Sequence, residues 1–417
     1  MGHKRKRTLT NIILSDLSWS PIVGVFGLRQ TGKTTLLETI SKIRGGQYFS
    51  LDDEAILASA QTAPQAFLST AGLLCLDEVQ KAPELFPAMK SSVGTKREPG
   101  RFLLTGSVRF TALEAVKESL TGRVILHELL PFSVSEIHHL PPSRFLEQLV
   151  ECREDEINPF FQNLRKISPT FRVSEKMIHT HAERGGLPIP CFMHDRGKRT
   201  QWFQAYFQTL LTRDVAMVHR GLRDLSFRLS LLFLRALSQA QGHEVTISDL
   251  SKQSGLSFGI SKRLLQALET LALIDRIPPL ALGKKSVKKL RIEWKDTGLW
   301  LHASGYTLTD QTSHEPLLAL SLSQEFRHQI SFFQPTPHWR HYRSLDGAKI
   351  PWIFESKKRQ VAITFIFEET PKPYSYRALR HFIEKNPKSL GVILGRATTK
   401  IVPLHPRIWL VPYTAVY

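Results

Sequence analysis

The stretch GLRQTGKT at residues 27–34 restricts the fold of this 417-residue chain more than any other feature of the sequence. It follows directly on an apolar run, Ile22–Phe26, and leads into an amphipathic run, Thr34–Ile43. Glycines in the loop let backbone N–H groups converge on an anion, and the helix that follows directs its positive N-terminal end at the same anion. A G-x-x-x-x-G-K-T spacing between a strand and a helix therefore predicts a loop that binds the phosphates of a nucleotide. The expected contacts are Gly27, Leu28, Arg29, Gln30, Thr31, Gly32, Lys33, Thr34 and Thr35.

Two chemical roles follow inside this loop and two in a second motif. Lys33 is expected to reach the β- and γ-phosphates, and the hydroxyl of Thr34 is expected to bind Mg²⁺. The stretch LLCLDE at residues 73–78 is four apolar strand residues that end in two carboxylates. A buried strand would place Asp77 beside the loop, where it can hold a water of the Mg²⁺ shell, and Glu78 is then expected to act as the general base. The alternative is an exposed acidic pair after a core strand.

Two further positions are candidates for contact with the reacting phosphate. Ser107 follows the next apolar run and is expected to sense the γ-phosphate, with Thr105 as the second choice and ordinary turn chemistry as the alternative. Arg123 is a candidate arginine finger, acting in its own chain or on a neighbouring subunit, and Arg109 is its rival. A plain surface role is the alternative for either arginine.

Short apolar runs alternate with helical patterns between residues 22 and 130, which predicts an α/β fold whose parallel sheet has helices on both faces. The expected strands are Ile22–Phe26, Tyr48–Leu51, Leu73–Leu76, Phe102–Leu104 and Val124–Leu126. After Pro131 the pattern changes, and residues 137–180 look irregular. We expect a phosphate-loop domain over residues 1–136, a helical lid or linker over 137–225, a small unit over 226–300 and an α/β domain over 301–417.

The basic residues are unevenly distributed. The net charge is +19, and residues 141–417 hold 40 of the 56 lysines and arginines against 24 of the 37 acidic residues. Such an excess favours a polyanionic partner, with a solvated basic surface as the alternative.

The cysteine count and the hydropathy indicate the compartment. The three cysteines, Cys75, Cys152 and Cys191, show no CxxC spacing, which excludes a disulfide scaffold and a cysteine-rich zinc site. Few cysteines fit a reducing compartment. The sequence contains no apolar run of 18 residues. We therefore expect a cytoplasmic protein with no membrane partner.

Residues 226–294 have the pattern of a winged helix. Helices are expected at Phe227–Leu237, Ile247–Gln253 and Phe258–Leu273, followed by two strand-like runs around GKKS at residues 283–286. Ser261, Lys262, Arg263 and Gln266 are expected to lie on the exposed face of the third helix. We expect duplex DNA to contact Lys262, Arg263, Lys284 and Lys285. A protein–protein joint or a lid on the nucleotide domain is the alternative.

Several strings, taken together, resemble a bacterial and archaeal ATPase family that joins an AAA+-type P-loop domain to a C-terminal domain of unknown function. They are GLRQTGKTTL (27–36), LCLDEVQKAPELF (74–86), RFLLTGS (101–107), SLTGRVILHELLPFSVSE (119–136), RGGLP (184–188), LLTRDV (210–215), DLSKQSGLS (249–257) and KDTGL (295–299). The resemblance implies ATP and Mg²⁺ as ligands. It also implies that one other strand separates the Asp77 strand from the phosphate-loop strand, and that Arg184 lies near the nucleotide as a second sensor.

In that family the C-terminal region often resembles a PD-(D/E)xK nuclease, in which two carboxylates and a lysine bind Mg²⁺ and activate water. In this chain Pro351 and Thr364 stand where the carboxylates would be, and Ile366 stands where the lysine would be. Glu315 remains as a candidate helix carboxylate, and Glu355, Glu368 and Glu369 are the alternatives for a relocated site. We therefore expect a nuclease-like fold without nuclease activity.

Three functions remain open at this point. The first is a Mg²⁺-dependent ATPase that couples ATP hydrolysis to DNA binding. The second is an ATP-gated protein-interaction switch with slow hydrolysis and no role for DNA. The third, a nuclease, lacks its metal ligands. The sequence leaves the oligomeric state open, with a homo-oligomer among the alternatives.

Overall fold

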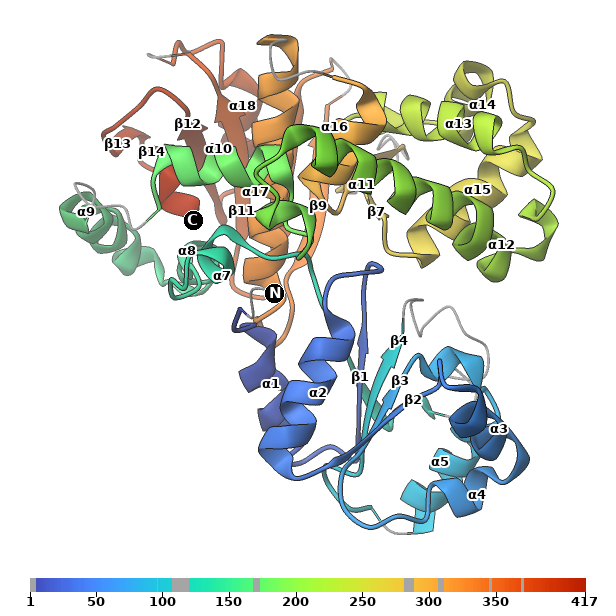
Figure 1. Cartoon of the computed structure of the whole chain (residues 1–417). Helices are drawn as coiled ribbons and strands as arrows, with labels where there is room; N and C mark the ends of the chain where they lie inside the picture. Colours follow the sequence, from blue (N-terminus) through green and yellow to red (C-terminus); the bar gives the residue numbers. More distant parts are fainter. Residues whose placement is uncertain are drawn as a thin grey trace.

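The computed structural model describes residues 5–95, 97–106, 120–167, 173–280, 289–306, 311–344, 347–368 and 371–417. Within these ranges the chain forms three sheets, of five, six and three strands. The five-stranded sheet forms a separate lobe, and the other two sheets lie together with most of the helices (Figure 1).

The N-terminal sheet is wholly parallel, and its strands are β1 (Ile22–Phe26), β2 (Gln47–Ser50), β3 (Leu74–Asp77), β4 (Phe102–Gly106) and β5 (Val124–Glu128). Their order is β2-β3-β4-β1-β5, so β4 separates the Asp77 strand from the phosphate-loop strand, as the resemblance implied. Helices α1 (Leu9–Asp16) and α2 (Lys33–Arg44) pack on one face, and α3 (Glu54–Thr62), α4 (Pro64–Phe67) and α5 (Leu85–Thr95) pack on the other. The predicted α/β class and parallel sheet are confirmed.

The segment that follows β5 differs from the prediction. Residues 137–180 looked irregular, but they contain most of α8 to α10, after the short α7; the bounds are α7 (Val134–Ile137), α8 (Phe145–Glu151), α9 (Ile157–Ile167) and α10 (Glu175–Arg184). Their buried residues, such as Phe145 and Phe161, pack in one cluster with Trp352 and Trp409 of the C-terminal sheet. These helices were missed because they are short and are interrupted by prolines and acidic turns, so the periodicity of their apolar residues is weak. The apolar residues that they pack against lie about two hundred residues away along the chain.

A helical unit follows, and it shares a single hydrophobic cluster that includes Phe203, Phe233, Leu264 and Trp294. Its elements are α11 (Arg196–Thr209), a π-helical turn (Leu210–Asp214), α12 (Val215–Val218), α13 (Phe227–Gln239), β6 (Glu244–Val245), α14 (Ile247–Ser254), α15 (Phe258–Thr270), β7 (Ile274–Ile277), β8 (Leu290–Trp294) and α16 (Thr297–Ser304). The three strands are antiparallel in the order β6-β8-β7. The three predicted helices are present, and Ser257 caps α15 by accepting a hydrogen bond from the backbone of Ile260.

The C-terminal sheet is mixed and has the order β13-β14-β12-β11-β10-β9. Its elements are α17 (Gln311–Ile330), β9 (His338–Arg343), β10 (Lys349–Glu355), β11 (Gln360–Ile366), α18 (Arg377–Lys385), β12 (Ser389–Gly395), β13 (Val402–His405) and β14 (Ile408–Pro412). α17 and α8 pack on one face and α18 packs on the other. The domain boundaries at residues 136, 225 and 300 stay a prediction.

The N-terminal lobe meets the rest of the chain at the edge where its strands end. Glu128, the last residue of β5, bonds the buried ammonium of Lys295, and that ammonium lies 3.2 Å from a carboxylate oxygen of Asp275. Arg327 of α17 also binds Asp275, at 3.0 Å. Figure 1 shows this edge of the lobe directed at the helical unit. Because the phosphate loop follows β1, it lies at the same junction.

Candidate nucleotide-binding site

The phosphate loop has a backbone that requires glycine at its first position. Gly27 has a φ of +152°, and a Cβ atom built on it would lie 2.4 Å from the carbonyl oxygen of Leu129. Gly32 has a φ of +94°, and Gln30 between them has a φ of +64°. These left-handed residues curl the chain into the turn that precedes α2. The loop predicted from the sequence therefore has the backbone form that a phosphate-binding loop needs.

Lys33 begins α2 and is turned back onto this loop. Its Nζ donates hydrogen bonds to the carbonyl oxygens of Leu28 at 2.8 Å and Gly27 at 3.0 Å. The residue is only 5% exposed, and burial lowers the pKa of its ammonium, against the opposing effect of the carboxylates of Glu78, Asp77 and Asp214. A buried cation is thus held at the centre of the loop.

Asp77 ends β3 and gathers polar groups from three neighbouring segments. Its carboxylate accepts hydrogen bonds from Thr34 Oγ1 at 2.6 Å and from the Tyr48 hydroxyl at 3.3 Å. The hydroxyl of Thr105 on β4 donates to the other carboxylate oxygen. Burial raises the pKa of Tyr48 to about 12, so its hydroxyl stays protonated as a donor at neutral pH. Thr105 thus holds Asp77 in place, and its role as the second choice for the γ-phosphate sensor stays a prediction.

Glu78 stands directly beyond the strand, in a left-handed conformation with a φ of +54°. Its backbone N–H donates to Asp77 Oδ1 at 3.0 Å, and its half-buried carboxylate accepts a hydrogen bond from the side chain of Gln80. The two carboxylates therefore have different partners, since Asp77 accepts from Thr34 and Glu78 accepts from Gln80. The structure thus brings together Lys33, Thr34, Asp77 and Glu78.

Other predicted residues are not brought to this place. β1 and β5 are parallel with Ile22 opposite Val124, so Arg123 precedes β5 at the edge opposite the phosphate loop. Five strand residues separate the two edges by roughly 16 Å. The prediction that Arg123 acts as a finger in its own chain is therefore wrong, and a role on a neighbouring copy stays a prediction. Ser107 and Arg109 lie outside the described residues.

A second layer of the site comes from two strings far apart in the sequence. Asp296, in the KDTGL string, accepts hydrogen bonds from the backbone N–H groups of Gly186 at 2.7 Å and Leu299 at 2.9 Å. This fixes the RGGLP turn, whose Pro188 lies 3.8 Å from a Cβ built on Gly32. Arg184 forms a hydrogen bond with His194 at 3.4 Å, and its role as a second sensor stays a prediction.

Replacing Asp296 with asparagine is expected to remove a pH dependence of stability. Burial raises the pKa of this carboxyl from 3.8 to about 6, although four backbone N–H groups oppose the shift. Between these values the folded protein keeps a proton that the unfolded chain has released. The free energy of unfolding therefore falls as the pH rises, by roughly 3 kcal/mol in total. Asparagine releases no proton, so the Tm of the wild type minus that of Asp296→Asn should fall between about pH 4 and about pH 6.5.

Asp195→Asn is the control for this measurement. Asp195 caps α11 at the surface, and a hydrogen bond from the backbone N–H of Lys198 lowers its pKa. A lowered folded pKa gives stability that grows as the pH rises, so the Tm difference for this variant should change in the opposite direction. A Tm difference for Asp296→Asn that stays constant or rises with pH would contradict the prediction.

An ion-pair cluster beside the loop was not predicted as part of the site. Arg29 of the phosphate loop donates to both carboxylate oxygens of Asp214, at 3.3 and 3.4 Å, and Arg213 donates to the same carboxylate at 3.0 Å. Leu28, next to Arg29, is buried in the hydrophobic cluster of the helical unit. Arg213 and Asp214 belong to the LLTRDV string, which carries part of the family resemblance but had no predicted role in the site.

Residues 20–138 match the family model of an AAA domain. This segment is an AAA-type P-loop domain. The strand order and the glycine-lined loop agree with that assignment. Residues 175–310 match the model of a domain of unknown function, which spans α10 to α16 and thus includes Asp214 and Asp296.

Relatives extend over most of the chain. Two uncharacterized mycobacterial proteins, from Mycobacterium tuberculosis and Mycobacterium bovis, are each 23% identical over 364 residues, which covers 87% of this chain and 73% of each relative. Among solved structures, the Walker-type ATPase of Pyrococcus abyssi is 15% identical with a TM-score of 0.37, covering 70% of this chain and 94% of that one. The Thermotoga maritima RuvB Holliday junction branch migration motor is 14% identical with a TM-score of 0.30, covering 66% and 90%. These structural likenesses are weak, and the assignment to the AAA type rests on the family match.

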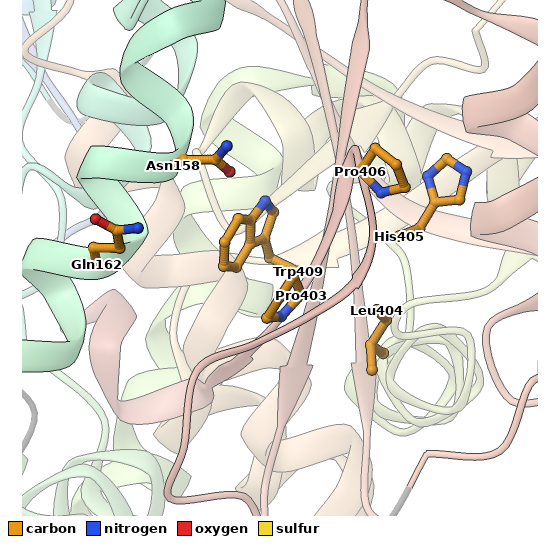
Figure 2. A pocket seen from close by; sticks show the side chains of 7 residues that line it. All are labelled: Asn158, Gln162, Pro403, Leu404, His405, Pro406 and Trp409. Atoms are coloured by element: carbon orange, nitrogen blue, oxygen red, sulfur yellow. The ribbon is translucent and has the colours of Figure 1, made fainter.

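One hollow elsewhere on the described surface differs in chemistry from the phosphate loop. It has a volume of 530 Å³, lies between α9 and the β13–β14 hairpin and is lined by Asn158, Gln162, Pro403, Leu404, His405, Pro406 and Trp409. In Figure 2 the nitrogen-bearing edge of Trp409 faces Asn158. No lysine or arginine lines this hollow, so it offers no charge to a phosphate. Among the described helices, none is long and apolar enough to cross a membrane.

Proposed function

We propose that this chain binds ATP with Mg²⁺ at the AAA domain, hydrolyses it, and couples this cycle to the binding of duplex DNA. The observation that carries the enzymatic part is the convergence of Lys33, Thr34, Asp77 and Glu78 where β1 and β3 end. Each group has the chemistry that phosphoryl transfer to water requires at that place.

The residues of the loop would exchange their present partners for the nucleotide. The ammonium of Lys33 has backbone carbonyls as acceptors, and phosphate oxygens are stronger acceptors because they are charged. Backbone N–H groups of residues 27–35 would bind the remaining phosphate oxygens. Glu78, beyond the strand and half-buried, would accept the proton of the attacking water.

The donor set beside the loop fits Mg²⁺. This ion keeps several waters and takes one or two protein oxygens together with substrate phosphates. Thr34 Oγ1 and Asp77 Oδ2, 2.6 Å apart, offer such a pair. The described residues contain no cluster of three or more His, Cys, Asp or Glu side chains that could bind a metal ion by themselves. When bound, Mg²⁺ would neutralise charge on the phosphates, and Thr34 and Asp77 would hold it.

The DNA part of the proposal rests on the surface of α15. The order of three helices and three strands over residues 227–294 supports the proposal of a winged helix. Lys262, Arg263 and Gln266 are exposed on α15. The expectation that Ser261 is also exposed is wrong, because this residue is fully buried. Lys284 and Lys285 lie outside the described residues and stay a prediction.

A neighbouring turn extends this basic surface. The guanidinium of Arg263 lies 3.0 Å from a Cβ built on Gly221, so the exposed Arg220 and Arg223 flank the same end of α15. Four exposed cations from α15 and this turn favour a polyanion, which supports DNA over the alternative of a protein joint.

The experiment that tests the proposal is steady-state ATP turnover at low salt, with and without duplex DNA. A rise in turnover with DNA is expected. Turnover that DNA does not change, together with ATP-dependent capture of a protein partner, would favour the protein-interaction switch. A chain that neither binds nor hydrolyses ATP would overturn the proposal. The C-terminal domain's lack of nuclease activity stays a prediction, to be checked by Mg²⁺-dependent cleavage of a plasmid.

Replacing Lys262 and Arg263 with alanine is expected to weaken DNA binding and its salt dependence. A cation that contacts a phosphate contributes about one unit to the slope of log affinity against log salt concentration. The double variant should therefore lose about two units of slope. Lys42→Ala, which removes an exposed charge from α2 of the AAA domain, is the control. A slope that equals that of the control would show that Lys262 and Arg263 belong to a solvated surface and contact no phosphate.

A further inference from the structure

The π-helical turn Leu210–Asp214 brings a carboxylate to the phosphate loop. The side chain of Asp214 is 4% exposed, while its partners Arg29 and Arg213 are 34% and 60% exposed. Both arginines bond the same oxygen, Asp214 Oδ1, at 3.3 and 3.0 Å. π-helical turns cost backbone geometry and occur frequently at functional sites. Here the turn places Asp214 between Arg29, which belongs to the phosphate loop, and Arg213, which belongs to the helical unit.

The charge of Asp214 also acts on the loop itself. Its carboxylate is among the groups that oppose the lowering of the pKa of Lys33. Burial raises the pKa of Asp214, and the hydrogen bond from Arg213 opposes that rise. One carboxylate thus stands near three cations, Arg29, Arg213 and Lys33, at the place where the phosphates of a nucleotide would add several negative charges.

We propose that Asp214 is a positioning residue of the nucleotide site, which holds Arg29 and Arg213 until the phosphates of a nucleoside triphosphate take these arginines from it. This inference rests on the proposed nucleotide binding. Phosphate oxygens compete with a carboxylate for guanidinium groups, and the terminal phosphate adds charge that a diphosphate lacks. Asp214 therefore lowers the affinity for a triphosphate, and binding of the triphosphate releases the contact between the loop and the helical unit.

The released contact has a direct route to the basic surface. The turn continues into α12, whose Val215 is buried in the same cluster as Leu264 of α15. A change at Asp214 would therefore be transmitted through one packed core to the helix that carries Lys262 and Arg263. This gives the proposed coupling between ATP and DNA a physical connection.

The test is isothermal titration of the full chain, in the presence of Mg²⁺, with the non-hydrolysable analogue AMPPNP and with ADP. Asp214→Asn keeps the shape of the side chain and removes its charge. We expect it to bind AMPPNP about tenfold more tightly than the wild type, from charges several ångströms apart at an effective dielectric constant of about 20. ADP should gain less. Asp195→Asn removes the same charge from the other end of α11 and is the matched control.

Arg213→Gln keeps the inference testable if Asp214→Asn does not fold, because Arg213 is largely exposed. We expect this variant to bind AMPPNP more weakly, by about three- to tenfold, with little change for ADP, and Arg196→Gln on α11 is its control. Equal affinities in Asp214→Asn and Asp195→Asn, or an unchanged affinity in Arg213→Gln, would overturn the inference while wild-type binding upholds the proposed function. A wild type that binds neither nucleotide would overturn both.

Discussion

The Glu78→Gln variant is expected to bind ATP as the wild type does and to lose at least about a hundredfold in turnover, because a general base contributes roughly 10² to 10⁴ in rate. Glutamine has nearly the same shape as glutamate but cannot accept the proton of the attacking water. Its carbonyl oxygen can still accept the hydrogen bond that Gln80 donates to Glu78. The turn after β3 should therefore persist. Binding is measured by titration with AMPPNP, and turnover is measured at saturating ATP with Mg²⁺.

Glu84→Gln is the matched control for this variant. Glu84 is exposed and lies six residues further along, ahead of α5. The same charge is removed there without touching the end of β3. If Glu78→Gln turns over ATP as fast as the wild type, Glu78 is not the base. Equal losses in Glu78→Gln and Glu84→Gln would instead attribute the effect to the net charge of this edge.

The core of the AAA domain was predictable because its strands are continuous apolar runs. All five strands were expected within about two residues at either end, and Ile22–Phe26 matches without change. A strand buried on both faces needs apolar side chains at every position, which separates it clearly from its surroundings. The order of the strands in the sheet could not be predicted in this way, because an alternation of strands and helices along the chain is compatible with several orders. The position of the Asp77 strand was predicted from the family resemblance.

The parts that failed depend on packing between distant segments. Arg123 lies in one of the strings that carry the family resemblance. Only the parallel register of β1 and β5 shows that it lies at the edge of the sheet opposite the phosphate loop. Ser261 is polar and lies off the apolar stripe of its helix, which predicted exposure, but it is fully buried. Asp214 lies 185 residues from Arg29, and neither residue alone signals an ion pair. Such contacts follow from tertiary structure, which single-sequence periodicity does not contain.

Lys33→Ala is expected to abolish measurable nucleotide binding without unfolding the protein. The ammonium of Lys33 is the buried cation at the centre of the loop, and alanine leaves no charge at that position. A variant that binds no nucleotide gains no stability from it. Lys33→Ala should therefore lack the increase in the free energy of unfolding that nucleotide gives the wild type, about 3 kcal/mol when the ligand is a hundredfold above its Kd. The measurement is the Tm of each variant with and without AMPPNP and Mg²⁺.

A second part of this prediction concerns the stability of the protein without nucleotide. Because burial lowers the pKa of Lys33, the unfolded chain binds the proton more tightly than the folded one, and the charge costs stability at neutral pH. Lys33→Met keeps the aliphatic stem and removes the charge, so its Tm without nucleotide should equal or exceed that of the wild type. Lys42→Met, exposed on the same helix, is the control and should change neither value. A Lys33→Met protein that melts earlier than the control would show that the ammonium stabilises the loop. One that AMPPNP still stabilises would show that the cation is not needed for binding.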